Sequence, residues 1–314
     1  MKKRIQNVIA IGPASSANLG SGFDCFAIAL NDLFDTVKIS LNDKSDVVIK
    51  NLNQIKDIPT QPTENTGGLV ALNIIKEFNL PNVTLGIKKG VPPGKGLGSS
   101  AATASAVAVG LNKMFSLKLS KQELLKFAAS GEIASAGVAH MDNVAGSLFG
   151  GFVVVSSYPK INIASFSSPT NLNVCIGIPK INTPPKKTGL ARKLLPKRVK
   201  FSDTITNVSN AAMMVAGFSK RDENLIGASM HDSIVEPARA STIPNYNIIK
   251  EQVLKSGGLG MAISGAGPSV IVFLNTNKLV QNKVKKIIKD GFKSAGYNSS
   301  LLMTKIGKGA RVIK

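Results

Sequence analysis

Residues 90-GVPPGKGLGSSAA-102 join a glycine-rich loop directly to the start of a helix made of small residues. Glycine lets backbone N–H groups approach a ligand closely, and the first turn of a helix leaves N–H donors unpaired at the positive end of its dipole. Ser99 and Ser100 add hydroxyl groups at the same point, which can hold phosphate oxygens or a water on a metal. The stretch therefore predicts an anion-binding loop. It is not a Walker A loop, because Lys95 is followed by Gly96 instead of serine or threonine.

Five segments resemble, in one order along the chain, motifs of the small-molecule kinases that include galactokinase, homoserine kinase, mevalonate kinase and phosphomevalonate kinase. Residues 96-GLGSSAA-102 are similar to the phosphate loop of this superfamily. Residues 13-PASSANLGSGFD-24, 140-HMDNVA-145, 236-EPAR-239 and 264-SGAGPS-269 are similar to motifs of its homoserine kinase branch. The alternative is a glycine-rich turn that caps an ordinary core helix, but such a turn has no need for so many glycines before a double serine. The resemblance covers nearly the whole chain.

The resemblance implies a two-domain α+β fold, the small-molecule kinase fold of this superfamily. A ribosomal-protein-S5-like N-terminal domain would pack against a ferredoxin-like C-terminal domain, with the site between them. The polar segment 158–173 contains Pro159 and Pro169 and is expected to be the connection at which the chain crosses from the first domain to the second. We therefore expect a nucleotide-phosphate-binding domain at residues 1–158 and a C-terminal domain at residues 159–314, which suits the chain length of 314 residues.

Hydrophobic periodicity predicts strands and helices mixed throughout the chain. Strands are expected at residues 5–11, 35–41, 46–50, 82–88, 151–157, 172–178, 260–264 and 269–274. Helices are expected at residues 67–78, 99–115, 121–137, 203–218, 222–231, 245–256 and 277–295. The helix from residue 99 is small or apolar on every side, which predicts that it is buried.

Phosphoryl transfer needs phosphate-binding groups, a metal-binding acid and a clamp on the acceptor. The resemblance implies that ATP and Mg²⁺ bind at the glycine loop, with Ser99 or Ser100 reaching the metal or the β-phosphate, Glu132 holding the metal, and Asn65 near the adenine. The residues assigned to the nucleotide are Pro92, Gly94, Lys95, Gly96, Leu97, Gly98, Ser99, Ser100, Ala101 and Asn65. Small neutral residues flank Glu132, which predicts a buried carboxylate, and such burial is costly without a cation.

The resemblance also implies an amino-acid acceptor, for which L-homoserine is the expected substrate. The residues assigned to it are Asn18, Asp24, His140, Arg192 and Arg239. Arginine forks suit a carboxylate because they donate two parallel hydrogen bonds, and Asp24 with His140 can bind the ammonium and hydroxyl ends. A kinase for another small alcohol, such as shikimate or an isoprenoid precursor, is the nearest alternative.

The catalytic roles implied by the resemblance fall on Glu132, Asn143 and Thr188. Mevalonate and galactose kinases use an aspartate as base, and Asn143 stands at the corresponding position. An asparagine cannot accept a proton, so we expect Asn143 to orient the acceptor while its proton leaves late or passes directly to the γ-phosphate. Asp142 is an alternative base or a hydrogen-bonding support. Thr188 is expected to contact the γ-phosphate or the acceptor hydroxyl.

The chain is strongly basic, with 39 Lys and Arg against 18 Asp and Glu and a formal net charge of +21. Such an excess is typical of proteins that bind nucleic acids or membrane surfaces. However, the lysines are spread along the chain, with one dense run at residues 186–200, and no zinc finger, RNP motif or aromatic stacking platform accompanies them. We expect a solvated basic surface that favours phosphorylated or carboxylate ligands, no specific nucleic acid and no membrane partner. A non-catalytic nucleic-acid-binding protein is the alternative.

Two cysteines and the absence of a long apolar stretch predict a cytoplasmic protein. Lys2, Lys3 and Arg4 precede an apolar stretch that is too short for a typical signal peptide. Cys25 and Cys175 are expected to be small core residues. The resemblance further suggests a homodimer.

Overall fold

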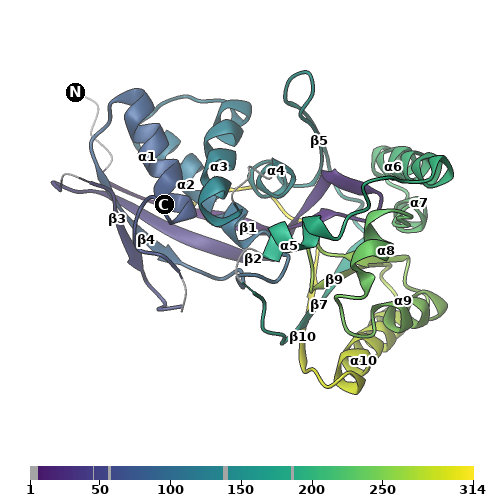
Figure 1. The fold of residues 1–314 in the computed structure, drawn as a ribbon. Coiled ribbons are helices and arrows are strands. Elements are labelled where there is room, and N and C mark those ends of the chain that lie inside the picture. Colours follow the sequence, from purple (N-terminus) through teal and green to yellow (C-terminus); the bar gives the residue numbers. More distant parts are fainter. Residues whose placement is uncertain (1–5, 45, 56–57, 137–140, 185–186) are drawn as a thin grey trace.

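The computed structural model describes residues 6–44, 46–55, 58–136, 141–184 and 187–314, which form two β-sheets with helices packed against them (Figure 1). The expected site residue His140 lies outside these ranges. The mixture of helices and sheets agrees with the expected α+β fold.

The first sheet is built on a long antiparallel hairpin of β1 (Asn7–Asn18) and β2 (Gly22–Leu41). The other strands are β3 (Val48–Asn51), β4 (Val83–Lys88), β5 (Phe152–Ser156), β6 (Asn162–Phe166) and β11 (Arg311–Val312), and the main path runs β11-β1-β2-β4-β3. The first half of β2 pairs with β5 and its second half with β4, while β6 extends the sheet beyond β5. This hairpin therefore reaches both halves of the molecule.

Four helices lie on one face of this sheet, where α1, α2 and α4 contact its strands and α3 packs on the other three helices (Figure 1). They are α1 (Thr66–Phe78), α2 (Ser99–Met114), α3 (Lys121–Ala136) and α4 (Met141–Phe149). Most residues of α2 are buried, as its composition predicts, and four of its alanines belong to the first hydrophobic core together with Val37 and Ile39 of β2. The glycine loop that precedes α2 is thereby attached to a rigid element.

The second sheet is antiparallel and has the order β10-β7-β9-β8. Its strands are β7 (Asn173–Pro179), β8 (Gly260–Ile263), β9 (Val270–Leu274) and β10 (Ser299–Thr304). The helices of this half are α5 (Lys187–Lys193), α6 (Phe201–Lys220), α7 (Glu223–Ala228), α8 (Val235–Ala240), α9 (Tyr246–Lys255) and α10 (Lys278–Ser294). Side chains from α9 and α10 pack on this sheet and form a second core, which we call the outer core.

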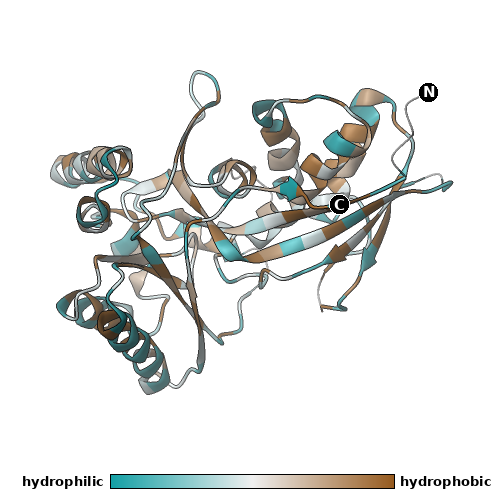
Figure 2. Ribbon diagram, turned by 180° about the vertical axis from the view of Figure 1, so that it is seen from behind, coloured by the Kyte–Doolittle hydropathy of each residue, from teal (hydrophilic) through white to brown (hydrophobic). Residues whose placement is uncertain are grey.

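A third core, which we call the middle core, connects the two sheets. It contains Phe26 and Ile28 of β2, Phe152 of β5 and Phe273 of β9, together with Phe218 of α6. The rings of Phe152 and Phe218 stack with their centroids 4.0 Å apart. Figure 2 shows hydrophobic residues concentrated along the strands and on the helix sides that face them. No helix within the described ranges is long and apolar enough to cross a membrane.

The structure confirms the expected strands and helices among the described residues, with displaced ends, and corrects four points. The hairpin extends through residues 12–34, beyond the strands expected there. Elements β6, β10, β11, α4, α5 and α8 were not expected. The segment 158–173, expected only to connect the two domains, contains β6, so the chain leaves the first sheet after residue 166. Cys175 is buried as expected, but Cys25 is exposed, because it lies at a solvent-facing position of β2.

Candidate active site

A cavity of about 760 Å³ opens where the phosphate loop, α3, α5 and the turn after β8 meet. Among the described residues that the sequence assigned to the site, all line this cavity except Pro92, whose place is taken by Pro93. The lining residues that the sequence interpretation missed include Phe23, Lys89, Thr103, Thr183 and Lys187. Residues far apart in the sequence thus meet around one space.

The phosphate loop, residues 92–98, depends on glycines with left-handed backbone. The φ angles of Gly94, Gly96 and Gly98 are 71°, 76° and 61°. A Cβ atom on Gly98 would lie 2.0 Å from the Ser15 hydroxyl oxygen, so no larger residue fits at the start of α2. The N–H groups of the first turn of α2 have no partner within the helix, and they are available for an anion.

The glycine turn 264–269 supports this loop from the other half of the molecule. The Ser264 hydroxyl donates to the Gly96 carbonyl oxygen at 2.7 Å, and the Ser269 N–H donates to the Lys95 carbonyl oxygen at 3.3 Å. This turn therefore lies directly against the phosphate loop.

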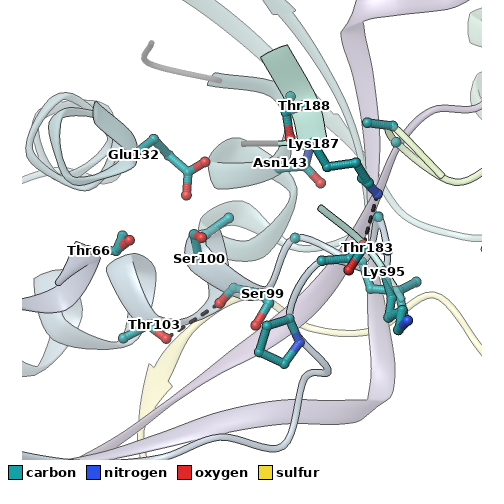
Figure 3. Close-up of a pocket in the computed structure, with 18 of the residues that line it drawn as sticks. Thr66, Lys95, Ser99, Ser100, Thr103, Glu132, Asn143, Thr183, Lys187 and Thr188 are labelled. Atoms are coloured by element: carbon teal, nitrogen blue, oxygen red, sulfur yellow. Dashed lines mark hydrogen bonds between the residues drawn. The ribbon is translucent and has the colours of Figure 1, made fainter. Parts of the chain in front are cut away.

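The two serines at the start of α2 have different surroundings. The Ser99 hydroxyl donates to the Val91 carbonyl oxygen at 2.8 Å and so closes the loop on itself. The Ser100 side chain lies on the same side of the cavity as the Glu132 carboxylate (Figure 3). This arrangement favours Ser100 over Ser99 as the hydroxyl that reaches a metal or a phosphate.

Glu132 and Asp142 are two buried carboxyl groups on the wall of the cavity, with 6% and 5% of their surface exposed. Burial, together with the neighbouring Asp142 charge, raises the pKa of Glu132 to about 8, although the Lys89 ammonium opposes this shift. Burial also raises the pKa of Asp142 to about 6, against hydrogen bonds from Asn143. A cation bound here would stabilise the ionised form of Glu132.

The site offers oxygen ligands of the kind that Mg²⁺ prefers, a carboxylate and a hydroxyl. Within the described ranges, no group of three or more His, Cys, Asp and Glu side chains could hold a metal by itself. Mg²⁺ commonly binds through one or two carboxylates and the phosphates of its substrate. The residues present therefore fit Mg²⁺ that arrives with a nucleotide.

A buried ion pair between Asp35 of β2 and Lys89 holds the start of the phosphate loop, and the sequence interpretation missed it. The Asp35 carboxylate also accepts from the Thr103 hydroxyl at 2.6 Å and from the two backbone N–H groups of residues 90–91 at 2.9 and 3.0 Å. The Lys89 ammonium donates to the Ser99 carbonyl oxygen at 2.8 Å and to the Thr103 hydroxyl at 2.9 Å. Burial lowers the pKa of Lys89, and Asp35 opposes that shift. This network fixes β2, the loop and α2 relative to one another.

The residues expected to hold the acceptor gather on the opposite side of the cavity. The Arg192 guanidinium donates to both carboxylate oxygens of Asp24, at 2.8 and 2.6 Å. The Asn18 amide donates to the Gly265 carbonyl oxygen at 2.9 Å and accepts from the Asp24 N–H at 3.2 Å. Asp24 thus orients Arg192, and both side chains are partly exposed to the cavity.

Arg239 of α8 completes this group and is buried, with 4% of its surface exposed. It donates to the carbonyl oxygens of Ala191 and Gly265, each at 3.3 Å. The guanidinium groups of Arg192 and Arg239 lie 5.4 and 5.1 Å from the centre of the Phe23 ring. Two arginines therefore converge on one aromatic side chain beside the phosphate loop, where a carboxylate could be bound.

Asn143 is fixed by hydrogen bonds to its side chain and backbone. Its side-chain oxygen accepts from the Ser15 hydroxyl at 3.0 Å, and its N–H donates to Asp142 at 2.7 Å. With its oxygen already engaged, the side chain presents its amide N–H₂ as a donor, which suits an orienting role. Thr188 lies near Asn143 across the cavity (Figure 3).

The basic run 186–200 was expected to be a solvated surface, and this expectation is wrong for Lys187. Its ammonium lies in the site and donates to the Gly94 carbonyl oxygen at 2.9 Å and to the Gly267 carbonyl oxygen. The sequence contains no feature that separates it from the neighbouring lysines, since only the start of α5 directs this side chain toward the cavity.

Comparisons with known proteins agree with this arrangement. Residues 66–151 match the family described as GHMP kinases N terminal domain, and residues 214–293 match GHMP kinases C terminal. The chain is 36% identical to a homoserine kinase of Methanococcus maripaludis over 98% of this chain and 99% of the relative. It is 39% identical to a homoserine kinase of Methanocella arvoryzae over 96% and 95% of the two chains. The crystal structure of homoserine kinase from Cytophaga hutchinsonii superposes with a TM-score of 0.91 at 33% identity, covering 100% of this chain and 99% of that one.

Proposed function

This chain belongs to the GHMP kinases, and from that premise we propose that it is an ATP-dependent homoserine kinase. It transfers the γ-phosphoryl group of ATP to the hydroxyl of L-homoserine and forms O-phospho-L-homoserine for threonine synthesis. The observation that carries the choice of acceptor is the pair of arginines, Arg192 and Arg239, beside Asp24 and next to the phosphate loop. A zwitterionic amino acid needs both signs of charge within a few ångströms, and this group supplies them.

In the proposed complex the phosphate loop and the first turn of α2 bind the β- and γ-phosphates through backbone N–H groups. Glu132 and Ser100 hold Mg²⁺, which when bound neutralises charge on the phosphate oxygens. Asn65, whose side chain caps α1 and lines the cavity, lies on the adenine side. Each of these groups positions charge and leaves the bond-making to the substrates, as phosphoryl transfer requires.

The acceptor binds between α5 and the first motif. Arg192 and Arg239 bind its carboxylate, and Asp24 with Asn18 binds its ammonium. We propose that His140 also binds the acceptor, and this assignment rests on the sequence motif alone. Asn143 donates to the acceptor hydroxyl and orients it, Thr188 contacts the hydroxyl or the γ-phosphate, and the proton passes late or directly to the transferred phosphate. Asp142 supports Asn143 through its hydrogen bonds.

The test is an assay of ADP release coupled to a spectroscopic signal, run with L-homoserine, shikimate and mevalonate in parallel. We expect saturable turnover with L-homoserine alone. Equal or faster turnover of either other alcohol would overturn the assignment. A second arm uses 3-aminopropanol, which is homoserine without its carboxylate. If it were as good a substrate as homoserine, the carboxylate clamp would be wrong.

We propose further that the enzyme acts in the cytoplasm as a homodimer and has no specific nucleic-acid or membrane partner. The support is the usual assembly of the family and the scattered distribution of the lysines. Sedimentation velocity tests the dimer. RNA binding that weakens steeply with salt, in a protein that does not turn over ATP, would instead support the nucleic-acid-binding alternative.

A further inference from the structure

The Lys187 ammonium lies at the junction of three parts of the cavity. It is carried by the first residue of α5, and it donates to one carbonyl of the phosphate loop, Gly94, and to one carbonyl of the glycine turn, Gly267. The same helix carries Arg192, which pairs with Asp24 on the acceptor side. Helix α5 therefore carries one cation to the phosphate loop and another to the acceptor side.

The surroundings of Lys187 are positive and lack a balancing acid. Lys187 forms no ion pair with a carboxylate of the described residues, whereas Asp24 and Asp35 each pair with another cation. Its charged neighbours are Lys95 of the phosphate loop and Arg239 of α8. Burial, reinforced by these two cations, lowers the pKa of Lys187 to about 7. An anion placed here would relieve this unfavourable charge.

The hydrogen bonds of Lys187 leave room for such an anion. An ammonium group has three donors, and two of them are used by the carbonyl oxygens of Gly94 and Gly267. The side chain also lines the cavity beside Thr188 (Figure 3). A lysine serves phosphate as a compact point charge, and the same residue can hold the loop in place.

We propose that Lys187 is a phosphate-binding residue of this enzyme, whose ammonium contacts the terminal phosphate of bound ATP while it joins the phosphate loop to the turn 264–269. The inference rests on the proposed function only in taking ATP as the phosphoryl donor. The competing role is a purely structural one, in which Lys187 joins the two backbone segments and never touches the nucleotide.

Isothermal titration calorimetry with Mg²⁺ and either ADP or the non-hydrolysable analogue AMP-PNP separates the two roles, because only AMP-PNP has a terminal γ-phosphate analogue. For Lys187→Met we expect the affinity for AMP-PNP to fall about tenfold or more, the loss expected for a hydrogen bond to a charged group, while the affinity for ADP changes less than threefold. Lys187→Arg should recover part of the loss. Lys193→Met removes the same charge from the exposed end of α5 and should bind both nucleotides as the wild type does.

Equal weakening of ADP and AMP-PNP in Lys187→Met would overturn the proposal in favour of the structural role, and so would unchanged binding of both. Thermal unfolding of each variant detects a general loss of structure. If Lys187→Met has lost structure, the ratio of AMP-PNP affinity to ADP affinity is compared between Lys187→Arg and the wild type, and this ratio decides between the two roles. The proposed function fails separately. A wild-type protein that favours AMP-PNP through Lys187 but does not phosphorylate homoserine would retain this inference and lose the acceptor.

Discussion

Replacing Asp35 by asparagine tests the network that holds the phosphate loop. Asp35 and Lys89 are nearly fully buried, with side-chain exposures of 0% and 4%. The amide oxygen of the introduced asparagine can still accept from the backbone of residues 90–91, but its N–H₂ group would face the ammonium of Lys89, donor against donor. Breaking a buried ion pair from one side costs about 3–5 kcal/mol, because the remaining charge loses its partner.

This cost can be measured by urea unfolding followed by circular dichroism. With a slope of about 2–3 kcal/mol per molar urea, the midpoint should fall by roughly 1–2.5 M. The double variant, which combines Asp35→Asn with Lys89→Met, removes both charges and should recover most of the lost stability. A loss below about 1 kcal/mol in the single variant, or a double variant no more stable than the single one, would refute the assigned role of this pair.

Four other predictions concern the site. Glu132→Gln keeps the shape of the side chain but loses the charge proposed to hold Mg²⁺. The kcat should therefore fall about a hundredfold or more, with little change in the unfolding midpoint. An unchanged kcat at saturating Mg²⁺ would contradict this role. Ser100→Ala should weaken ATP binding in kinetic assays more than Ser99→Ala, and the reverse order would overturn the preference for Ser100. Arg239→Lys should raise KM for homoserine roughly ten- to a hundredfold and leave KM for ATP near the wild-type value, since the planar fork is lost; a normal KM for homoserine would remove Arg239 from the clamp. Finally, the pKa values of about 8 for Glu132 and about 6 for Asp142 lie above their ordinary values of 4.5 and 3.8. The folded, Mg²⁺-free protein therefore binds more protons than the unfolded chain, and its stability to urea should fall as the pH rises from about 4 to about 7; Glu132→Gln should show a flatter profile, and a rise over this range would contradict the assignment.

Local sequence was sufficient where a backbone conformation or a short motif defines the structure. The glycines before Ser99 predict the loop, and small residues around Glu132 predict its burial; both are confirmed. The long hairpin was harder to predict, because the small residues 12–18 have weak strand preference and form a strand through pairing with β2.

Long-range charge pairs could not be predicted from the sequence. Asp35 and Lys89 are 54 residues apart and look like ordinary surface charges until the sheet brings them together. Lys187 stands in a run of basic residues, and its inward orientation depends on the position of α5. Cys25 was wrongly assigned to the core because it has apolar neighbours; pairing with β5 begins one residue later, at Phe26, and leaves Cys25 exposed.

The middle core has a mechanical consequence for catalysis. Strand β2 contributes Phe26 and Ile28 to this core and Val37 and Ile39 to the first core, so a single strand belongs to both halves. A motion that separates the two sheets would break the stacking of Phe152 on Phe218 and expose the surrounding apolar side chains to water. At about 1.5–3 kcal/mol for each large apolar side chain exposed, four such residues would cost about 6–12 kcal/mol, comparable with the whole stability of a typical domain. Among the described residues, the two sheets therefore have no inexpensive hinge between them, and we expect substrates and products to pass over the rim of the cavity while the sheets stay together.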